Sequence, residues 1–462
     1  MQLSLRAAGI VSLLAGATRA LQIDWNSDDS IKDAASTVAF GLVKYYTGNN
    51  TGDTPGNLPD PYFWWEAGAM FGTLVDYWFY TGDETYNAIT TQALQHQAGE
   101  DSDYMPQNQT RSLGNDDQGF WAMAAMTAAE NNFPNPPEGQ PQWLALVQAV
   151  FNEYITRWDA DTCGGGLRWQ VFTFNNGYSY KNSISNGCFF NIASRLARYT
   201  GNQTYGDWAE KVWDWMEAVQ FIDADFNVYD GAGADKGCVD STSAMDLQRR
   251  YLPAGSSYDV RKTPLPVKGQ DTWKQRVEGL VKRTNEYFFD DNIVVERPCE
   301  GFNSCDYDQQ SFKGYLMRWM TSASQMAPFT FDTLMPILKI NAAAAAQQCS
   351  GSPAADLYKG PAGTACGFKW TEKEKFDGLA GVGEQMSALS AIQYTLVKKQ
   401  TAAPLTATTG GTSVGNPDAG RPMEAYMPSL TPISTGEKVA AGFVTSAIAF
   451  SVLGACFFVT RD

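Results

Sequence analysis

The sequence predicts an all-α fold in which six helical hairpins close into an (α/α)6 barrel. Two observations lead to this prediction, namely apolar side chains at helical spacing and a motif that recurs at helix ends. Apolar residues three and four positions apart fill 67–78, 121–129 and 144–155, and this spacing places them on one face of a helix. Patterns that alternate between apolar and polar residues, as strands do, are scarce along the 462 residues.

The repeated motif is a glycine followed by polar residues and an aromatic side chain. It is clearest at 80–86 and 199–205, with looser copies at 139–143 and 269–273. Glycine readily adopts the left-handed conformation that ends a helix, and the polar residues after it can cap the next helix. The four glycines stand 57, 62 and 68 residues apart, a period that fits one helical hairpin with its loops. A superhelical solenoid is the alternative, but the long irregular loops favour a closed ring with a site at one end.

The composition excludes several classes of function. There are 50 acidic and 34 basic residues, so the formal net charge is −16, whereas a nucleic-acid surface needs basic residues. His96 is the single histidine, which excludes sites built from several histidines. It also excludes Ser-His-Asp and Cys-His catalysis unless His96 is the base. There is no CxxC pattern, and no metal or cofactor is predicted. Carboxylates are therefore expected to do any acid–base chemistry.

The two ends of the chain predict export and anchoring. Residues 1–20 have a basic start, an apolar run and small residues before position 21, as in a secretory signal peptide. Residues 21–400 are predicted to form the folded domain, and 401–438 a stalk rich in Thr, Gly, Ser and Pro. The tail 439–462 is predicted to be a GPI signal, with attachment after the stalk's small residues, best represented in 413–420. A transmembrane anchor is the alternative.

Export places the chain in an oxidising compartment, and three glycosylation sequons, at Asn49, Asn108 and Asn202, fit this prediction. Seven of the eight cysteines precede the tail. Two local disulfides are expected, Cys299 with Cys305 and Cys349 with Cys366. Two of Cys163, Cys188 and Cys238 can form a third, which leaves one free thiol.

The sharpest local feature is the pair Asp116 and Asp117, which follows Gly114 and precedes an apolar helix. Acidic residues at a helix start often serve only as caps. Retaining cleavage of a glycoside, however, needs two carboxyl groups about 5–5.5 Å apart, one as nucleophile and one as acid/base. Two charges that close raise the pKa of one group, as a general acid requires. The other acidic pairs, at 28–29 and 290–291, are interpreted as a cap and a turn.

The stretch 115–121 (Asn-Asp-Asp-Gln-Gly-Phe-Trp) resembles the Asp-Asp motif of glycoside hydrolase family 76. The blocks 62–69, 180–187 and 383–388 resemble other conserved blocks of that family. Combined with the export signal and the anchor tail, they resemble its fungal cell-wall subgroup. The resemblance covers about residues 21–399.

The resemblance implies an (α/α)6 barrel with retaining, endo-acting α-1,6-mannosidase activity, in which Asp116 is the nucleophile and Asp117 the acid/base. For the fungal subgroup it implies transglycosylation, in which the enzyme cuts the mannose core of a GPI glycan and passes the mannoprotein to wall β-glucan. We therefore expect a monomer on the outer face of the plasma membrane and in the cell wall. The alternative is a catalytically silent, mannan-binding or structural wall protein. A membrane-tethered receptor is disfavoured because only three residues follow the apolar run that ends at Val459.

Eight further residues are predicted to contact the sugar. Aromatic rings can stack on sugar faces or simply pack in the core, and polar side chains can bind hydroxyl groups or satisfy loop backbone. The predicted platforms are Trp64, Trp65, Trp121, Trp169 and Tyr180, and the predicted polar contacts are Glu66, Asn182 and Asn186.

One segment departs from the family pattern. After Cys238 that pattern has Trp-[Ser/Thr]-Tyr-Asn-x-Gly and then a helix, whereas residues 243–258 are basic, irregular and broken by proline. Suitable codons for 245–258, read one base later, spell Trp-Thr-Tyr-Asn-Ala-Gly-Ile-Tyr-Leu-Leu-Gly-Ala-Ala. We hypothesise that about 242–268 is a frame-shifted or mis-spliced translation, and the alternative is a true insertion loop.

Overall fold

The computed structural model describes residues 21–239, 270–373 and 376–420, which belong to one compact unit. Short helical stretches between 435 and 451 belong to a second unit, 421–462. The predicted signal peptide and the segment 242–268 lie outside the described residues, as does most of the predicted anchor tail. Within the part of the chain that is described, no helix is both long and apolar enough to cross a membrane.

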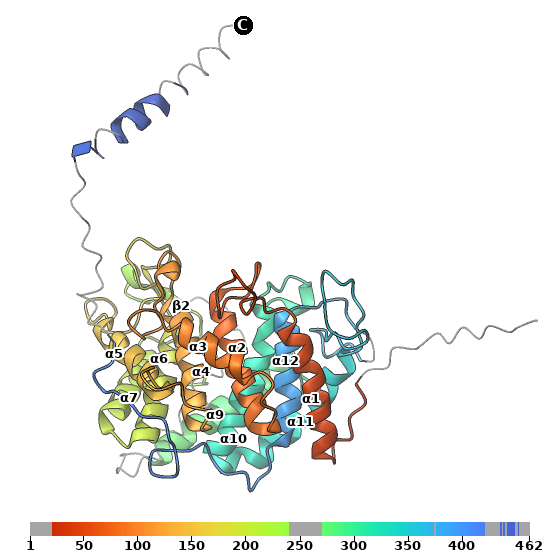
Figure 1. The fold of residues 1–462 in the computed structure, drawn as a ribbon. Coiled ribbons are helices and arrows are strands. Elements are labelled where there is room, and N and C mark those ends of the chain that lie inside the picture. The colour runs from red at the N-terminus through yellow and green to blue at the C-terminus, as the bar shows by residue number, and fades with distance from the viewer. Residues whose placement is uncertain are drawn as a thin grey trace, which may run out of the picture. The chain divides into compact units, whose positions relative to one another are not determined.

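The described helices of the folded unit run side by side (Figure 1), and their contacts divide them into an inner and an outer set. In the inner set, α2 packs on α4 and α12, α4 on α6, and α10 on α12. In the outer set, α1 packs on α12, α3 on α2, α5 on α4 and α6, α7 on α6, and α11 on α10 and α12. The inner helices are α2(Trp64–Thr81), α4(Asn115–Glu130), α6(Ser183–Thr200), α10(Phe312–Met326) and α12(Val382–Gln393), and the outer helices are α1(Asp28–Val43), α3(Asn87–His96), α5(Trp143–Thr156), α7(Gln203–Ala218), α9(Gln270–Phe288) and α11(Phe331–Gln348). This arrangement confirms the predicted all-α barrel.

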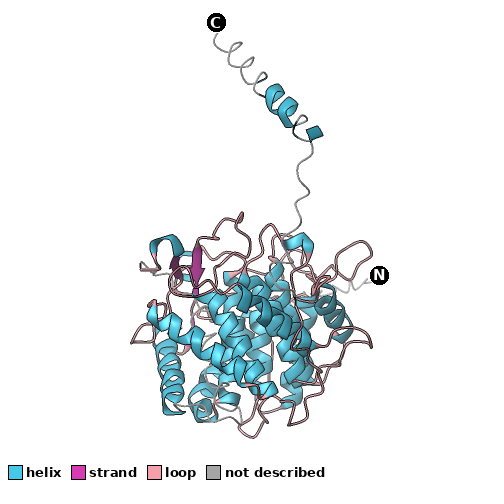
Figure 2. Cartoon of the chain, turned by 90° about the vertical axis from the view of Figure 1, so that its left-hand side faces the viewer, coloured by secondary structure: helices cyan, strands magenta, loops and turns pink. Residues whose placement is uncertain are grey.

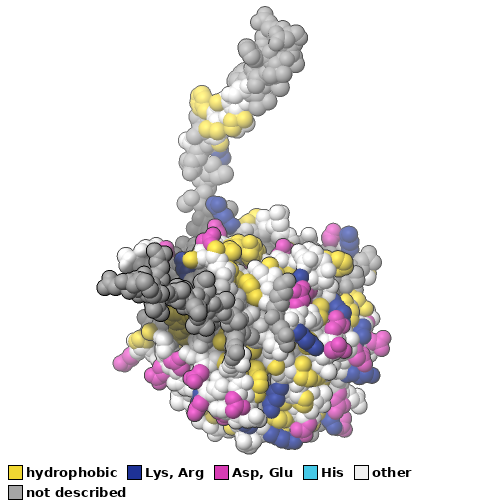
Figure 3. All heavy atoms as spheres, turned by 90° about the vertical axis from the view of Figure 1, so that its right-hand side faces the viewer, with side chains coloured by type: hydrophobic (Ala, Val, Ile, Leu, Met, Phe, Trp, Pro, Cys, Tyr) yellow, Lys and Arg dark blue, Asp and Glu magenta, His cyan; other side chains and the backbone are white. Residues whose placement is uncertain are grey.

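The two sets differ in how their side chains are buried. Along α4 every residue except Asp117 is buried, as a helix surrounded by neighbours requires. In α2, Gly68 lies so close to the Trp121 indole that a Cβ there would stand 2.9 Å from the ring. Outer helices bury one face, and α7 does so at Tyr205, Ala209, Val212 and Met216. Figure 3 shows charged side chains interspersed over the side of the molecule where α1 and α11 lie.

The predicted helix-end motif is confirmed at its two clearest copies. Gly82 ends α2 with φ 79° and Gly201 ends α6 with φ 72°. After Gly201, the side chain of Asn202 accepts a hydrogen bond from the Thr204 N–H and caps α7. Gly139 also has a positive φ of 86°, but it lies in the α4–α5 loop and ends no helix. The copy at 269 falls outside the described residues.

Ion pairs join facing inner helices. Arg318 of α10 pairs with Asp76 of α2 at 2.8 Å, and Arg195 of α6 pairs with Glu130 of α4 at 2.6 Å. All four side chains line a small cavity of about 40 Å³. These buried charges are compensated by their partners, so removing one partner would leave the other charge unpaired in the interior.

Strands lie at one end of the helices (Figure 2). β1(Tyr180–Asn182) pairs antiparallel with β2(Gly231–Gly233), and β3(Phe289–Asp290) with β4(Ile293–Val294). Single 3-10 turns complete the connections: η1(Gln107–Gln109), η2(Ala234–Lys236), η4(Glu300–Phe302), η5(Gln309–Ser311), η6(Pro328–Thr330) and η7(Tyr394–Leu396).

Three disulfides are present in the described residues. Cys299–Cys305 and Cys349–Cys366 confirm the two local bridges that the sequence predicts. The third joins Cys163 to Cys238, and this choice leaves Cys188 as a free, buried thiol.

The folded unit extends further toward the C-terminus than predicted. The sequence predicts a stalk from residue 401 onward, but residues 401–420 form a strap across the helices. The Leu405 N–H donates to the Glu130 carbonyl at the end of α4 at 2.9 Å. The Ser413 hydroxyl accepts from the Leu144 N–H in the first turn of α5 at 3.0 Å. The predicted boundary at 400 is wrong because these backbone groups find their partners in the strap, a long-range pairing that composition does not reveal.

Candidate active site

The site begins at the N-terminus of α4. Gly114 has an extended backbone with φ −91°, and its N–H donates to the Asp117 Oδ2 at 2.7 Å. The Asp117 N–H in turn donates to the Asp116 Oδ1 at 3.0 Å. Both carboxylates thus lie in the first turn, where the free N–H groups and the helix dipole favour negative charge. The capping function that the sequence left as an alternative is therefore real, and it fixes the two side chains side by side.

Asn115, which precedes the pair, is held on all sides. Its N–H donates to the Trp169 carbonyl at 2.8 Å, and its Nδ2 donates to the Arg168 carbonyl at 2.8 Å. Its Oδ1 accepts from Arg157 at 2.6 Å, and its carbonyl accepts from the Tyr154 hydroxyl. These hydrogen bonds fix the start of α4, and they thereby fix the backbone that carries the side chains of Asp116 and Asp117.

The two carboxyl groups have different surroundings. Asp116 is 7% exposed, and its Oδ2 accepts a hydrogen bond from the Asn182 Nδ2 at 3.1 Å. Burial raises the pKa of Asp117 well above its usual range, and the charge of Asp116 raises it further, against the Gly114 N–H, which lowers it. Asp117 therefore keeps a proton under conditions in which an ordinary aspartate has lost it, as a general acid must.

Both aspartates line an inner pocket of about 250 Å³. Its walls are aromatic and polar, a lining typical of sugar-binding sites. The remaining lining residues are Trp65, Phe120, Trp169, Tyr180, Asn182, Ile184, Asp230 and Asp308.

A second, outer pocket of about 790 Å³ adjoins the inner one. Asp117, Trp65, Trp169 and Asp308 line both pockets, whereas Asp116 lines the inner pocket only. Asp117 therefore lies at the junction. The residues that line only the outer pocket include Phe63, Trp64, Arg111, Gln170, Asn175 and Asn176.

Five of the eight predicted sugar contacts reach a pocket. Trp65, Trp169, Tyr180 and Asn182 line the inner pocket, and Trp64 lines the outer one. The Trp169 indole is 38% exposed, enough to offer a face to a ligand.

Glu66, Trp121 and Asn186 line neither pocket, and all three are 0% exposed. Trp121 stacks on Tyr104 inside the barrel, with ring centroids 5.8 Å apart. The Asn186 side-chain amide binds the backbone of Leu167: its Oδ1 accepts from the Leu167 N–H at 2.8 Å, and its Nδ2 donates to the Leu167 carbonyl at 3.1 Å.

Glu66 is also a structural residue. Its Oε2 accepts from the Phe63 N–H at 2.7 Å and caps α2. Its other carboxyl oxygen has no hydrogen-bond partner. The carboxyl is buried and lines neither pocket.

Asp230 and Asp308 also line the inner pocket, although the sequence did not predict them as site residues. Asp230 precedes β2 and accepts a hydrogen bond from the Tyr180 hydroxyl. Asp308 precedes η5, and its Oδ1 accepts from the Gln309 N–H at 2.8 Å. Both follow a tyrosine, as Tyr229-Asp230 and Tyr307-Asp308, but such a dipeptide is too common to have singled them out. In the described part of the chain, no group of three or more His, Cys, Asp and Glu side chains is arranged to hold a metal ion.

Two adjacent carboxyl groups, of which one has a raised pKa and borders both aromatic pockets, match what double displacement at a glycosidic bond requires. On a barrel of paired helices, such a site is that of a glycoside hydrolase.

Comparison with known proteins gives the family. Residues 30–408 match the model of glycosyl hydrolase family 76, and the chain belongs to this family. The chain is 47% identical to the mannan endo-1,6-alpha-mannosidase DCW1 of Saccharomyces cerevisiae over 441 residues, 94% of each protein. It is 40% identical to the mannan endo-1,6-alpha-mannosidase DFG5 of the same yeast, covering 94% of this chain and 92% of that one.

Solved structures share the fold. Dfg5 from Chaetomium thermophilum, in complex with glucosamine, superposes with a TM-score of 0.81 at 43% identity, over 88% of this chain and 100% of that one. An α-1,6-mannanase from Salegentibacter sp. HEL1_6 superposes with a TM-score of 0.62 at 16% identity, over 81% of this chain and 99% of that one. That structure is of an inactive variant, with two consecutive aspartates replaced by asparagine, in complex with α-1,6-mannotriose.

Proposed function

We propose that this protein is a retaining, endo-acting α-1,6-mannosidase that transfers the cut mannose chain to a second glycan. The position of Asp117 at the junction of the two pockets, with Asp116 in the inner pocket alone, carries the proposal. The names of the relatives, mannan endo-1,6-alpha-mannosidases, support the substrate class.

The geometry assigns a role to each pocket. The nucleophile must face the anomeric carbon of the sugar that is retained, and the acid must face the glycosidic oxygen on its far side. The mannose that is attacked therefore occupies the inner pocket, beside Asp116. The leaving part of the chain occupies the outer pocket, which begins at Asp117.

In the first step the Asp116 carboxylate attacks the anomeric carbon and forms a glycosyl ester. The bond between that carbon and the O6 of the next mannose breaks, and its electron pair stays on O6. Asp117 gives its proton to this oxygen, so the leaving chain departs as a neutral alcohol. Asp117 is then ionised and can act as the base.

In the second step a hydroxyl group enters from the outer pocket. Asp117 takes its proton, the oxygen attacks the anomeric carbon, and the ester to Asp116 breaks. The product is an α-mannoside, and both aspartates return to their starting states. The entering hydroxyl belongs to β-glucan in the wall reaction that we propose, and to water in simple hydrolysis.

The outer pocket supports transfer because it offers an acceptor both stacking surfaces and polar groups. Phe63 and Trp169 are exposed by 51% and 38%. Arg111 and Gln170 line the same pocket and carry side-chain hydrogen-bond donors. An acceptor bound there excludes water from the ester and so favours transfer over hydrolysis.

The proposed setting is the outer face of the plasma membrane and the adjoining cell wall. The signal peptide 1–20 and the apolar tail 439–462 support export and a GPI anchor. The mannose core of GPI glycans is then the proposed donor. Release of the protein from intact cells by a phosphatidylinositol-specific phospholipase C tests the anchor, and retention on the cells would contradict it.

The reaction is tested by incubating the purified folded unit with an α-1,6-mannotetraose and a β-glucan oligosaccharide, and by weighing the products by mass spectrometry. A joined mannose–glucose product supports transfer, and shorter mannosides alone mean hydrolysis. If neither product forms, the alternative, a silent mannan-binding protein, is favoured. Asp116→Asn and Asp117→Asn are the matched inactive controls, and activity retained in both would refute the assignment of roles.

A further inference from the structure

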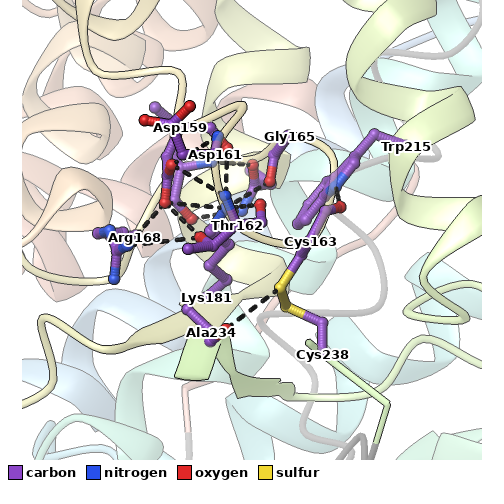
Figure 4. The surroundings of a disulfide bond; sticks show 12 residues. Asp159, Asp161, Thr162, Cys163, Gly165, Arg168, Lys181, Trp215, Ala234 and Cys238 are labelled. Atoms are coloured by element: carbon purple, nitrogen blue, oxygen red, sulfur yellow. Dashed lines mark hydrogen bonds and ion pairs between the residues drawn. A yellow bond between two sulfur atoms is a disulfide. The ribbon is translucent and has the colours of Figure 1, made fainter. Parts of the chain in front are cut away.

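Lys181 is the middle residue of β1, and its side chain is fully buried. Successive side chains of a strand point to opposite faces. Tyr180 and Asn182 line the inner pocket, so Lys181 points away from it. On that side its ammonium group enters the loop 159–166 (Figure 4).

The loop places its oxygen atoms around this ammonium. Lys181 Nζ donates to the carbonyl oxygens of Asp159 at 3.0 Å, Thr162 at 2.7 Å and Gly165 at 2.5 Å. It also stands 3.2 Å from the Asp159 Oδ2. An ammonium group has three protons and no acceptor, so three carbonyls saturate it. The loop is folded around a cation that belongs to β1.

The same loop runs directly into the active site. Arg168 pairs with Asp159 at 2.8 Å and lies opposite Lys181 in a β-bridge. The next residue, Trp169, donates its N–H to the Tyr180 carbonyl at 2.7 Å. Its carbonyl accepts from the Asn115 N–H at 2.8 Å, immediately before the catalytic pair. A shift of the loop would therefore move Trp169 and the start of α4 together.

The far side of the loop is also fastened. Cys163 is bonded to Cys238, and its carbonyl accepts from the Trp215 indole N–H at 3.0 Å. Gly166, with φ 94°, lies against the same indole, and a Cβ there would stand 2.3 Å from it. Lys181 is thus the attachment on the active-site side, and Cys163 and Gly166 are the attachments on the side of α7.

We propose that Lys181 is a positioning residue: its ammonium holds the loop 159–166 so that Trp169, and Asn182 on the other face of β1, stay in place beside Asp116. The inference rests on the proposed function, because it concerns the same site. It differs from a catalytic role in that Lys181 touches no sugar and acts through the loop and the strand.

The role depends on the charge of Lys181. The charged groups that face it are Asp159, from the loop, and Arg168, two residues after the loop, while α7 contributes the ring of Trp215 and β2 a backbone pairing at Ala232. The pKa of Lys181 is lowered to about 8, mainly by burial. The negative charge of Asp159 raises this pKa, and the positive charge of Arg168 lowers it. A neutral amine has only two protons for the same acceptors, so the loop loosens as the pH rises past that value.

The test replaces Lys181 by a side chain of similar length without charge, in the full-length protein. In Lys181→Met we expect amide hydrogen exchange across 159–170 and at Asn115 to accelerate at least 10-fold, and kcat on an α-1,6-mannotetraose to fall at least 10-fold. Lys274→Met, which changes a half-exposed lysine on α9, is the matched control and should leave both quantities unchanged. Unchanged exchange and unchanged kcat in Lys181→Met would overturn the proposal.

A second variant tests the charge and covers the case in which Lys181→Met does not fold. Asp159→Asn keeps the three carbonyl acceptors but removes the carboxylate that raises the pKa of Lys181. We expect the alkaline fall of activity to move to lower pH by at least half a unit, and an unmoved profile would contradict the role of the charge. Hydrogen exchange needs no turnover. If exchange accelerates in Lys181→Met as expected but the wild-type protein cleaves no mannan, the proposed function is refuted. The role of Lys181 in shaping the loop is then still supported.

Discussion

The amide Nδ2 of Asn182 donates a hydrogen bond to the Oδ2 of Asp116 across 3.1 Å, and it links the residue before α6 to the first turn of α4. The same side chain caps α6, since its Oδ1 accepts from the Ser185 N–H at 3.2 Å. One amide thus uses its acceptor for folding and its donor for the active site. The bond fixes the orientation of the Asp116 carboxyl group.

The two functions of Asn182 can be separated by substitution. Asn182→Ser keeps a good helix cap but is too short to reach Asp116. We expect the unfolding free energy to change by less than about 1 kcal/mol and kcat to fall about 10- to 100-fold, because the nucleophile loses its orientation. Thermal unfolding and steady-state kinetics measure the two effects. Loss of stability in proportion to the loss of activity would mean that the residue serves only the fold.

The leaving group of the substrate can distinguish Asp117 from Asp116. Asp117→Asn removes the acid, and we expect cleavage of α-1,6-mannan to slow about 10²- to 10⁴-fold. An aryl mannoside whose phenol is acidic needs no proton to depart, so its first step should remain fast and release a burst of phenol. Asp116→Asn should give no burst with the same substrate. A burst in both variants, or in neither, contradicts the assignment.

Stability should depend on pH through Glu384, at the start of α12. Burial raises the pKa of Glu384 from 4.5 to about 8. Between those values the folded protein keeps a proton that the unfolded chain has lost, so this contribution is full below about pH 4.5 and is lost as the pH rises to about 8. We expect the unfolding free energy to fall by about 1 kcal/mol per pH unit in this window.

Glu384→Gln removes the titration and should flatten this dependence in denaturant titrations between pH 5 and 8. The exposed Glu84, changed to Gln, is the control and should leave the slope as it is. An equal slope in the wild type and in Glu384→Gln would show that other groups set the dependence.

The strap 401–420 predicts a boundary for truncation. A protein that ends at Gly420 should unfold at the same temperature as the full chain. One that ends at Gln400 leaves the Glu130 carbonyl and the Leu144 N–H without their strap partners. Each buried, unpaired backbone group costs about 1–3 kcal/mol, so the melting temperature should drop by several degrees. Equal melting temperatures for the two truncations would restore the predicted boundary.

The hypothesis that about 242–268 is a frame-shifted or mis-spliced translation is tested by sequencing the cloned transcript. We expect the spliced message to encode the family pattern with Trp-[Ser/Thr]-Tyr-Asn-x-Gly between Cys238 and Gly269. An in-frame message that encodes 245–258 as printed would refute the frame-shift hypothesis and leave an insertion loop. Those residues lie outside the described part of the chain, so this remains a prediction from sequence.

Much of the site was predictable because its signals are local. The pair Asp116–Asp117 stands at a helix start, and the cap that Asp117 forms with Gly114 spans three residues. Helical periodicity and the left-handed glycines at 82 and 201 are also local, which is why they predict the barrel. The local disulfides Cys299–Cys305 and Cys349–Cys366 close short loops, 6 and 17 residues apart.

Other assignments depend on what packs against each side chain. Trp64, Trp65 and Trp121 are equally aromatic, yet Trp121 lies behind Trp64, at a centroid distance of 5.3 Å, and is cut off from the pockets. Asp230 and Asp308 come from distant loops and line the same pocket as Asp116 and Asp117 only because the packing of the helices brings those loops to one end.

The sequence by itself determined the class of fold, the family and the two carboxylates that we propose as catalytic, because helix periodicity, capping and the family motifs are properties of short stretches of chain. The tertiary structure decided which aromatic rings face a ligand, that Asp117 stands between two pockets, and that Lys181 holds the loop before Trp169. It also moved the end of the folded unit from 400 to 420. These features depend on long-range packing and on the pairing of buried polar groups, and both are settled only when distant segments meet.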